Sequence, residues 1–175
     1  MRIMISQPRY LPTINYLRRI LSSDLFIILD NVQRQSRGYE NRNKLFIPDL
    51  RWLTIPIKSS SREVLATTHI DFSSPWLTDH IDKINVWYQN HPFYEPDAAS
   101  RFMSKIEDND LFVLSMIEHL KNIFAMFDQQ FTYVRASEFV GNEQGYGPGN
   151  LSELLSTIQV ERERIYISGP NGRDY

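Results

Sequence analysis

Two short apolar runs with an amphipathic segment between them occupy the first thirty residues, and this order restricts the fold more than any other feature. Residues 3–5 predict a short buried strand. The five consecutive apolar residues 25–29 predict a strand buried on both faces, as in a parallel sheet. Between them, apolar side chains recur at helical spacing over residues 14–21, with Thr13 as the predicted N-cap. A strand, a helix and a strand in this order are typical of a βαβ unit.

The rest of the chain continues to alternate between strand and helix patterns. Two apolar runs, 44–47 and 52–57, flank a Pro-Asp turn and predict an antiparallel hairpin. Further strands are expected at 68–72, 131–135 and 164–168, and further helices begin at Ser74, Asp97, Asp110 and Asn150. We therefore expect an α/β fold with a mostly parallel sheet in three layers, helices on both faces and a small antiparallel hairpin. Residues 1–175 are expected to form one domain, and a C-terminal extension is expected beyond the strand-end loop where this sequence stops.

The composition excludes several classes of function. With no cysteine in 175 residues, disulfides, thiolate catalysis and cysteine-type zinc sites are absent. The four histidines lie on separate predicted elements without the spacing of metal ligands, so no metal site is predicted. A net charge of −2 gives no general attraction to nucleic acid, and no apolar run approaches the roughly 20 residues of a membrane span. Because no signal-peptide pattern is present either, we expect a cytoplasmic protein that binds neither nucleic acid nor membrane.

The segment at residues 6–12, Ser-Gln-Pro-Arg-Tyr-Leu-Pro, joins the first strand to the first helix, and we call it the hinge. Its two prolines hold the backbone extended. The hinge therefore places the polar side chains of Ser6, Gln7, Arg9 and Tyr10 where a strand ends and a helix begins. Ligands of α/β proteins bind at such strand ends, and helix N-termini bind anions. The alternative is a loop that only turns the chain.

A second group of polar residues, 30–44, follows the second strand without any apolar period, and its four cationic side chains outnumber two acidic ones. Guanidinium groups bind phosphate oxygens in pairs, and asparagine amides hold a sugar or a pantetheine amide, so a phosphorylated small molecule is the expected ligand. Asp30 is expected beside the hinge, because the carboxyl ends of parallel strands meet at one edge of the sheet. The candidate binding residues in this group are Gln33, Arg37, Asn41, Arg42 and Asn43. The alternative is a solvated basic loop.

Two glycine-containing segments are weaker candidates. After the last predicted strand, Gly169 lets backbone amides approach a phosphate, with Ser168 and Arg173 nearby, although an ordinary turn has the same pattern. The loop 141–149 holds four glycines and is either a lid over a site or a plain surface loop.

Several segments together resemble the WbqC-like protein family. The resemblance rests on the hinge with Tyr16, on residues 30–33, 41–43, 52–57 and 167–169, and on Trp76. It runs in order over essentially the whole chain, and the Gln-Pro-x-Tyr-x-Pro block of the hinge is its most specific part. The family is bacterial and occurs among enzymes that build O-antigen and related surface polysaccharides. Ser6 departs from the pattern, because many members have histidine there; if that histidine were the general base, this chain would need another.

The resemblance implies a transferase that places an acyl or aminoacyl group, of glycyl type, on a nucleotide-linked amino sugar. The amine would attack an activated carbonyl while Asp30 or a water takes the proton, with Gln7 as the second catalytic candidate. The phosphorylated partner would be a nucleotide sugar or a pantetheine-type donor, and the sequence indicates no cofactor or oligomeric state. One alternative is a nucleotidyltransferase-like enzyme, although its usual His-x-Gly-His signature is missing. Another is a non-catalytic nucleotide-sugar-binding protein, which Ser6 favours.

Overall fold

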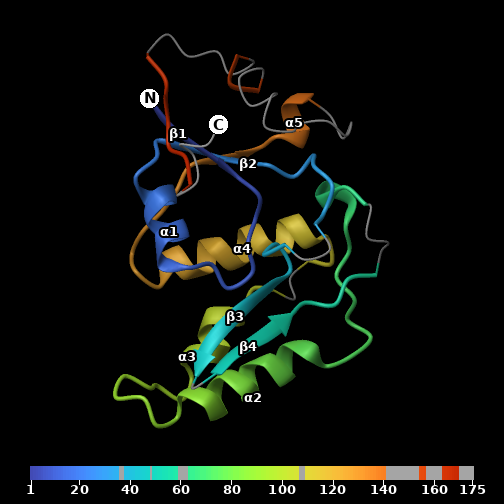
Figure 1. Cartoon of the computed structure of the whole chain (residues 1–175), viewed down its shortest axis with the longest axis vertical. Coiled ribbons are helices and arrows are strands. Elements are labelled where there is room, and N and C mark those ends of the chain that lie inside the picture. The colour runs from blue at the N-terminus through green and yellow to red at the C-terminus, as the bar shows by residue number, and fades with distance from the viewer. Residues whose placement is uncertain are drawn as a thin grey trace.

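A parallel sheet of four strands, in the order β5-β2-β1-β6, lies across one half of the molecule (Figure 1). The computed structural model describes residues 1–35, 38–47, 49–58, 63–106, 109–140, 154–156 and 163–169. The four strands are β1 (Arg2–Ser6), β2 (Leu25–Ile28), β5 (Tyr133–Arg135) and β6 (Ile165–Tyr166). Helix α1 (Ile14–Leu21) connects β1 to its parallel neighbour β2, so the predicted βαβ unit is confirmed.

The predicted hairpin is also present, with its second strand starting earlier than expected. It consists of β3 (Arg42–Ile47) and β4 (Asp49–Thr54), paired antiparallel from Arg42 opposite Thr54 to Ile47 opposite Asp49. The strand β4 ends before Pro56, which has no N–H to donate to a ladder.

The remaining helices lie between the hairpin and β6. They are the 3-10 turn η1 (Leu65–Thr67), α2 (Trp76–Tyr88), α3 (Ala98–Met103), α4 (Phe112–Ala125) and α5 (Ser137–Val140). The strand expected at 68–72 was wrong, because His69 and Ile70 form isolated bridges to two different partners instead of one ladder. The helix expected from Asn150 falls mostly outside the described residues. In the part of the chain described here, no helix is long and apolar enough to cross a membrane.

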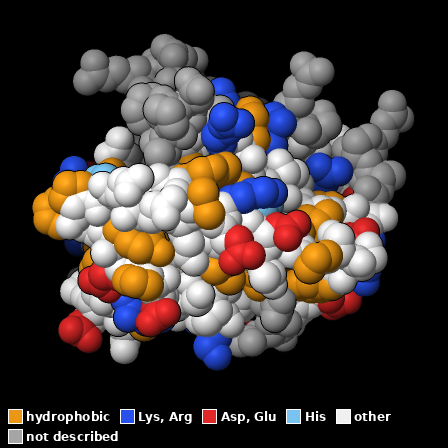
Figure 2. Space-filling model, turned by 90° about the horizontal axis from the view of Figure 1, so that it is seen from below, with side chains coloured by type: hydrophobic (Ala, Val, Ile, Leu, Met, Phe, Trp, Pro, Cys, Tyr) orange, Lys and Arg blue, Asp and Glu red, His pale blue; other side chains and the backbone are white. Residues whose placement is uncertain are grey.

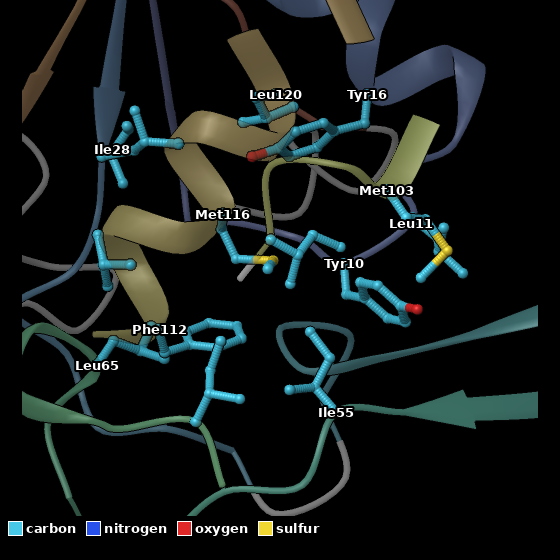
Figure 3. Packing of buried hydrophobic residues seen from close by; sticks show 14 of the residues in the cluster. Tyr10, Leu11, Tyr16, Ile28, Ile55, Leu65, Met103, Phe112, Met116 and Leu120 are labelled. Carbon is cyan, nitrogen blue, oxygen red and sulfur yellow. The ribbon is translucent and has the colours of Figure 1, made fainter. Parts of the chain in front are cut away.

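Two hydrophobic clusters lie on the two faces of the parallel sheet, because successive side chains of a strand point to opposite faces. Met4, Phe26 and Ile28 join the larger cluster, on the side of α1 and α4. Figure 3 shows residues of α4 in this cluster together with Tyr10 of the hinge and Ile55, which follows β4. Ile3 and Ile27 join the smaller cluster, with Ala136 before α5 and with Leu154. The predicted α/β class is therefore confirmed, with helical segments on both faces of the sheet (Figure 1).

Candidate functional site

The carboxyl ends of β1, β2 and β5 lie side by side, and the hinge leaves the sheet there. Ser6 pairs with Ile28, and Leu29 N donates to Ser6 O at 3.0 Å. After β1 the chain passes to the α1 face, whereas the connection from β5 to β6 includes Ala136 and Leu154 of the opposite cluster. The connection after β2 also passes to the α1 face, so connections leave toward opposite faces between the neighbouring strands β2 and β5. Open α/β sheets bind ligands at such points.

Hydrogen bonds from three directions fix the hinge. The Tyr16 hydroxyl of α1 donates to Gln7 O at 2.8 Å, and Tyr10 N donates to Glu40 O at 2.9 Å. The Asn43 amide donates to Leu11 O at 2.5 Å. Leu11 has a φ of 45°, a left-handed conformation that is unfavourable for a leucine. The Asn43 bond helps to hold the backbone in this conformation, so the hairpin shapes the hinge.

A polar cavity of about 180 Å³ opens between the hinge and the segment before β3. Its lining residues are Gln7, Arg9, Gln35, Gly38, Tyr39 and Glu40. The Glu40 side chain fits because residue 38 is glycine: a Cβ there would collide with the Glu40 carboxylate. The two polar groups that the sequence predicted, the hinge and the segment after β2, therefore meet at one cavity.

Glu40 is the most unusual titratable group of this cavity. It is only 2% exposed, and neither carboxylate oxygen has a hydrogen-bond partner among the described residues. Burial raises the pKa of Glu40 above the ordinary carboxyl value, although the nearby backbone N–H groups of Glu40 and Gln35 and the positive charges of Arg9 and Arg34 lower it. An unpartnered, buried carboxyl with a raised pKa beside a cavity is typical of a general base or acid.

Two arginines approach the ring of Tyr16 from the hinge and from α1. The Arg9 guanidinium carbon lies 5.4 Å from the ring centroid, and that of Arg19 lies 5.7 Å away. Within the described residues, no hydrogen bond or ion pair engages either guanidinium. Burial, followed by the charge of Arg9, lowers the pKa of Arg19. The two positive charges repel each other, and both attract an anion. A negatively charged ligand placed near both guanidiniums would therefore be held strongly.

Asp30 lies at the carboxyl end of β2, as predicted, and is fully buried. Its two oxygens accept hydrogen bonds from Arg135 Nε at 2.7 Å, from Ser137 N at 2.9 Å and from Ser137 Oγ at 2.7 Å. Asp30 therefore ties the end of β5 and the start of α5 to β2, and it fixes the direction of the Arg135 side chain.

A family model described as the WbqC-like protein family matches residues 7–175 of the chain. The chain belongs to the WbqC-like protein family. Uncharacterized protein Rv1507c of Mycobacterium tuberculosis is 25% identical to it over 179 residues, which cover 99% of this chain and 74% of that protein. No solved structure matches the chain. The resemblance based on the hinge and the later segments is therefore confirmed.

The structure brings some of the site residues predicted for this WbqC-like chain together and separates others. Gln7 and Arg9 line the cavity, with Ser6 immediately before them. Ser168 and Gly169 follow β6, and Arg19 Nη1 would be 3.4 Å from a Cβ at residue 169. Arg37 and Arg173 lie outside the described residues, as does the loop 141–149.

The other predicted binding residues face different surroundings. The Tyr10 hydroxyl is 2.8 Å from His80 Nδ1 in the core, and the Asn41 amide donates to Ile55 O at 2.8 Å. Asn43 holds the hinge, Gln33 forms an exposed bridge to Val64, and Arg42 lies on the outer face of the hairpin. For all of these residues, contact with a substrate stays a prediction.

Sequence reasoning missed Glu40, Arg19 and Arg135 as site residues. Arg19 lies three residues after Tyr16, so helical spacing could have placed it beside that ring. Arg135 ends a predicted strand, which was a usable signal. Asn31, next to Asp30, is fully buried, and its amide atoms have no hydrogen-bond partner among the described residues. No sequence pattern marks such an unpaired amide.

Larger hollows lie elsewhere in this WbqC-like fold. A cavity of about 560 Å³ is lined by residues of α4 and of the segment 128–131, before β5, at the opposite end of the sheet. An apolar cavity of about 310 Å³ lies beside Leu11 and Pro12, against α2 and α3. On the face seen in Figure 2, hydrophobic side chains are interspersed with charged ones of both signs. The cavity at Glu40 differs from both in combining a buried acid with a cation.

Proposed function

We propose that the chain is an acyl or aminoacyl transferase that acts on the amine of a nucleotide-linked amino sugar. The observation that carries this proposal is the buried, unpartnered Glu40 carboxyl, which shares a cavity with Gln7 and Arg9 at the carboxyl end of β1. Acylation of an amine needs a base that accepts a proton and groups that hold the amino sugar in place. In this proposal Glu40 accepts the proton and Arg9 helps to hold the sugar nucleotide.

The diphosphate of the nucleotide sugar would bind between the hinge and α1. Arg9 and Arg19 both lie near Tyr16 and have guanidinium N–H groups to donate. Gly169 lies close to Arg19 and allows a phosphate oxygen to approach the backbone. Two guanidiniums held in one place form the bidentate bonds that phosphate groups accept.

In the proposed reaction, the sugar amine attacks the carbonyl carbon of an acyl or aminoacyl thioester, of pantetheine type. A C–N bond forms and the C–S bond breaks. The Glu40 carboxylate accepts a proton from the amine nitrogen, and the leaving thiolate takes up a proton in turn. Gln7 lines the same cavity, and its side-chain amide is placed to donate to the carbonyl oxygen as negative charge develops there.

Ser6 and Asp30 have supporting parts in this mechanism. Ser6 stands where many members of the family have histidine. Glu40 would supply the base that the serine does not. Asp30, predicted as a base, uses both oxygens to hold Arg135 and Ser137, which supports a positioning part for it. The family resemblance supports a place in bacterial surface polysaccharide synthesis, and the absence of cysteines fits a reducing cytoplasm.

The test is an acyl-transfer assay followed by mass spectrometry. The wild-type protein is incubated with UDP- and dTDP-linked amino sugars and with acetyl or glycyl thioesters. We expect an acylated sugar nucleotide, and Glu40→Gln should lower kcat at least about a hundredfold, the size of a lost general base. Glu118→Gln is the matched control, because Glu118 is half-buried on α4, away from the cavity, and pairs with Lys121.

The pH profile separates a base from a merely structural carboxyl. A general base must be ionised. As the pH is lowered, a base with a raised pKa is protonated earlier, so the wild-type rate should begin to fall at a higher pH than it would with an ordinary carboxyl. In Glu40→Gln this acidic limb should disappear. Binding of the sugar nucleotide without turnover under any donor would instead identify a non-catalytic binder, and pyrophosphate release from a nucleoside triphosphate would identify a nucleotidyltransferase.

A further inference from the structure

Three side chains gather on the outer face of the β3–β4 hairpin. Lys44 and Trp52 are directly opposite each other across the two strands, and Arg42 lies two residues before Lys44 on the same face. The Arg42 guanidinium carbon is 4.1 Å from the Trp52 ring centroid, and Lys44 Nζ is 4.8 Å from it. The neighbouring residues Asn43 and Leu53 point inward and are buried. The hairpin thus presents an indole ring with two cations beside it.

Tyr39 connects this group to the cavity at Glu40. Its ring centroid is 5.7 Å from that of Trp52, with the two planes tilted by 39°. The Arg9 guanidinium carbon lies 5.9 Å from the Tyr39 ring centroid, and Tyr39 itself lines the cavity. We call Tyr39, Trp52, Arg42 and Lys44 the outer platform. It runs without a break into Arg9 and from there to Tyr16.

Both rings of the outer platform remain open to solvent. Trp52 is 40% exposed and Tyr39 is 44% exposed, and their tilt keeps either ring from covering the other in a face-to-face stack. Exposed aromatic rings beside cations are the surfaces on which bases stack, because every base has a π-face. Arg42 Nε donates to Gly38 O at 3.2 Å, which holds the guanidinium in place before any ligand arrives.

We propose that the outer platform is the nucleobase subsite, on which the base of a nucleoside diphosphate stacks against Trp52 and Tyr39 while its phosphates lie at Arg9. This rests on the proposed function, in which the diphosphate binds at Arg9 and Arg19. A nucleotide joins a flat ring to an anionic group, and the platform joins exposed rings to Arg9 in the same order. Recognition by stacking accepts any base, so the subsite would favour nucleotides over sugar phosphates and would discriminate little between bases.

Calorimetric titration with three probes tests this subsite: UDP, inorganic pyrophosphate and a single-stranded oligo(dT). We expect UDP to bind the wild type at least about tenfold more tightly than pyrophosphate, and Trp52→Ala to remove that advantage while leaving pyrophosphate affinity unchanged. Trp52→Phe should keep most of the affinity, because it keeps a ring. Phe93→Ala is the matched control, since Phe93 is an exposed aromatic residue outside the platform.

Other outcomes would overturn the proposal. Equal affinities for UDP and pyrophosphate, or equal losses of both in Trp52→Ala, would show that the platform holds no base. Much tighter binding of oligo(dT) than of UDP would identify a single-strand surface instead. Failure of the proposed function looks different, because UDP then binds through Trp52 but no acyl transfer occurs. Acyl transfer that is unaffected by Trp52→Ala would instead contradict only the nucleobase subsite.

Discussion

At the scale of single residues, the site depends on how closely Gly38 and Glu40 pack. The carboxylate lies against the backbone of residue 38, where a Cβ would collide with it. A larger residue at this position would force the Glu40 carboxylate to move, so the glycine allows the acid its buried position. A substitution at residue 38 therefore moves the Glu40 carboxylate and leaves the carboxyl group itself intact.

Gly38→Ala should therefore displace the Glu40 carboxylate and cost about 1–3 kcal/mol of unfolding free energy through overpacking. The rate of acyl transfer should fall as well, because the carboxylate is displaced. Urea unfolding and the transfer assay measure the two effects. For unfolding, Gly169→Ala is the matched control, because its Cβ would meet Arg19 Nη1 at 3.4 Å, an ordinary contact. Equal stability of the two variants would contradict the packing described for Glu40.

The residue scale is also where the sequence was least informative. The pattern of segment 30–44 indicated a polar site, but Glu40 entered it only as one of two negative charges. Asn41 and Asn43 were predicted to bind substrate because amides bind sugars, yet their side-chain amides donate to backbone carbonyls. Whether an amide serves the backbone or a ligand depends on contacts from distant segments, which a local pattern does not contain.

At the scale of elements, the hairpin and the hinge act as one unit. Asn43 of β3 donates to Leu11 O, and its own Oδ1 accepts from Lys44 N at 2.7 Å. Asn43→Ala removes these bonds and leaves a buried carbonyl next to a backbone in the left-handed region. We expect a loss of about 2–4 kcal/mol in unfolding free energy, larger than a typical single hydrogen bond.

Ligand affinity should weaken in the same variant, because the hinge carries Gln7 and Arg9. Urea unfolding and UDP titration check the two effects, with Asn15→Ala as the control, since Asn15 is exposed on α1. An Asn43→Ala protein as stable as Asn15→Ala would mean that the hairpin does not hold the hinge.

The elements themselves followed closely from the sequence. Two apolar runs around an amphipathic segment predicted β1, α1 and β2, because buried parallel strands and amphipathic helices have distinct periods. The run 68–72 alternates polar and apolar residues as a strand does, yet His69 and Ile70 bridge to Leu111 and Ile57 separately. A strand needs one continuous partner, and which segment lies alongside is decided by the whole fold.

At the scale of the whole molecule, two ends of the parallel sheet compete as binding sites. The cavity of about 560 Å³ beside residues 128–131 exceeds the cavity of about 180 Å³ at Glu40. Size favours the first. The second has the buried acid, the Arg9 and Arg19 guanidiniums beside Tyr16, and the strand ends at which the chain changes faces. We infer that this chemistry, and not the larger volume, marks the functional end of the WbqC-like fold.

A crystal structure of the chain bound to a UDP-linked amino sugar would decide between these two ends of the sheet. We predict electron density at the carboxyl edge of the sheet, with the diphosphate within hydrogen-bond distance of Arg9 or Arg19 and the amine facing Glu40. The same ligand bound instead beside residues 128–131, with no density in the Glu40 cavity, would show that the functional end is the opposite one.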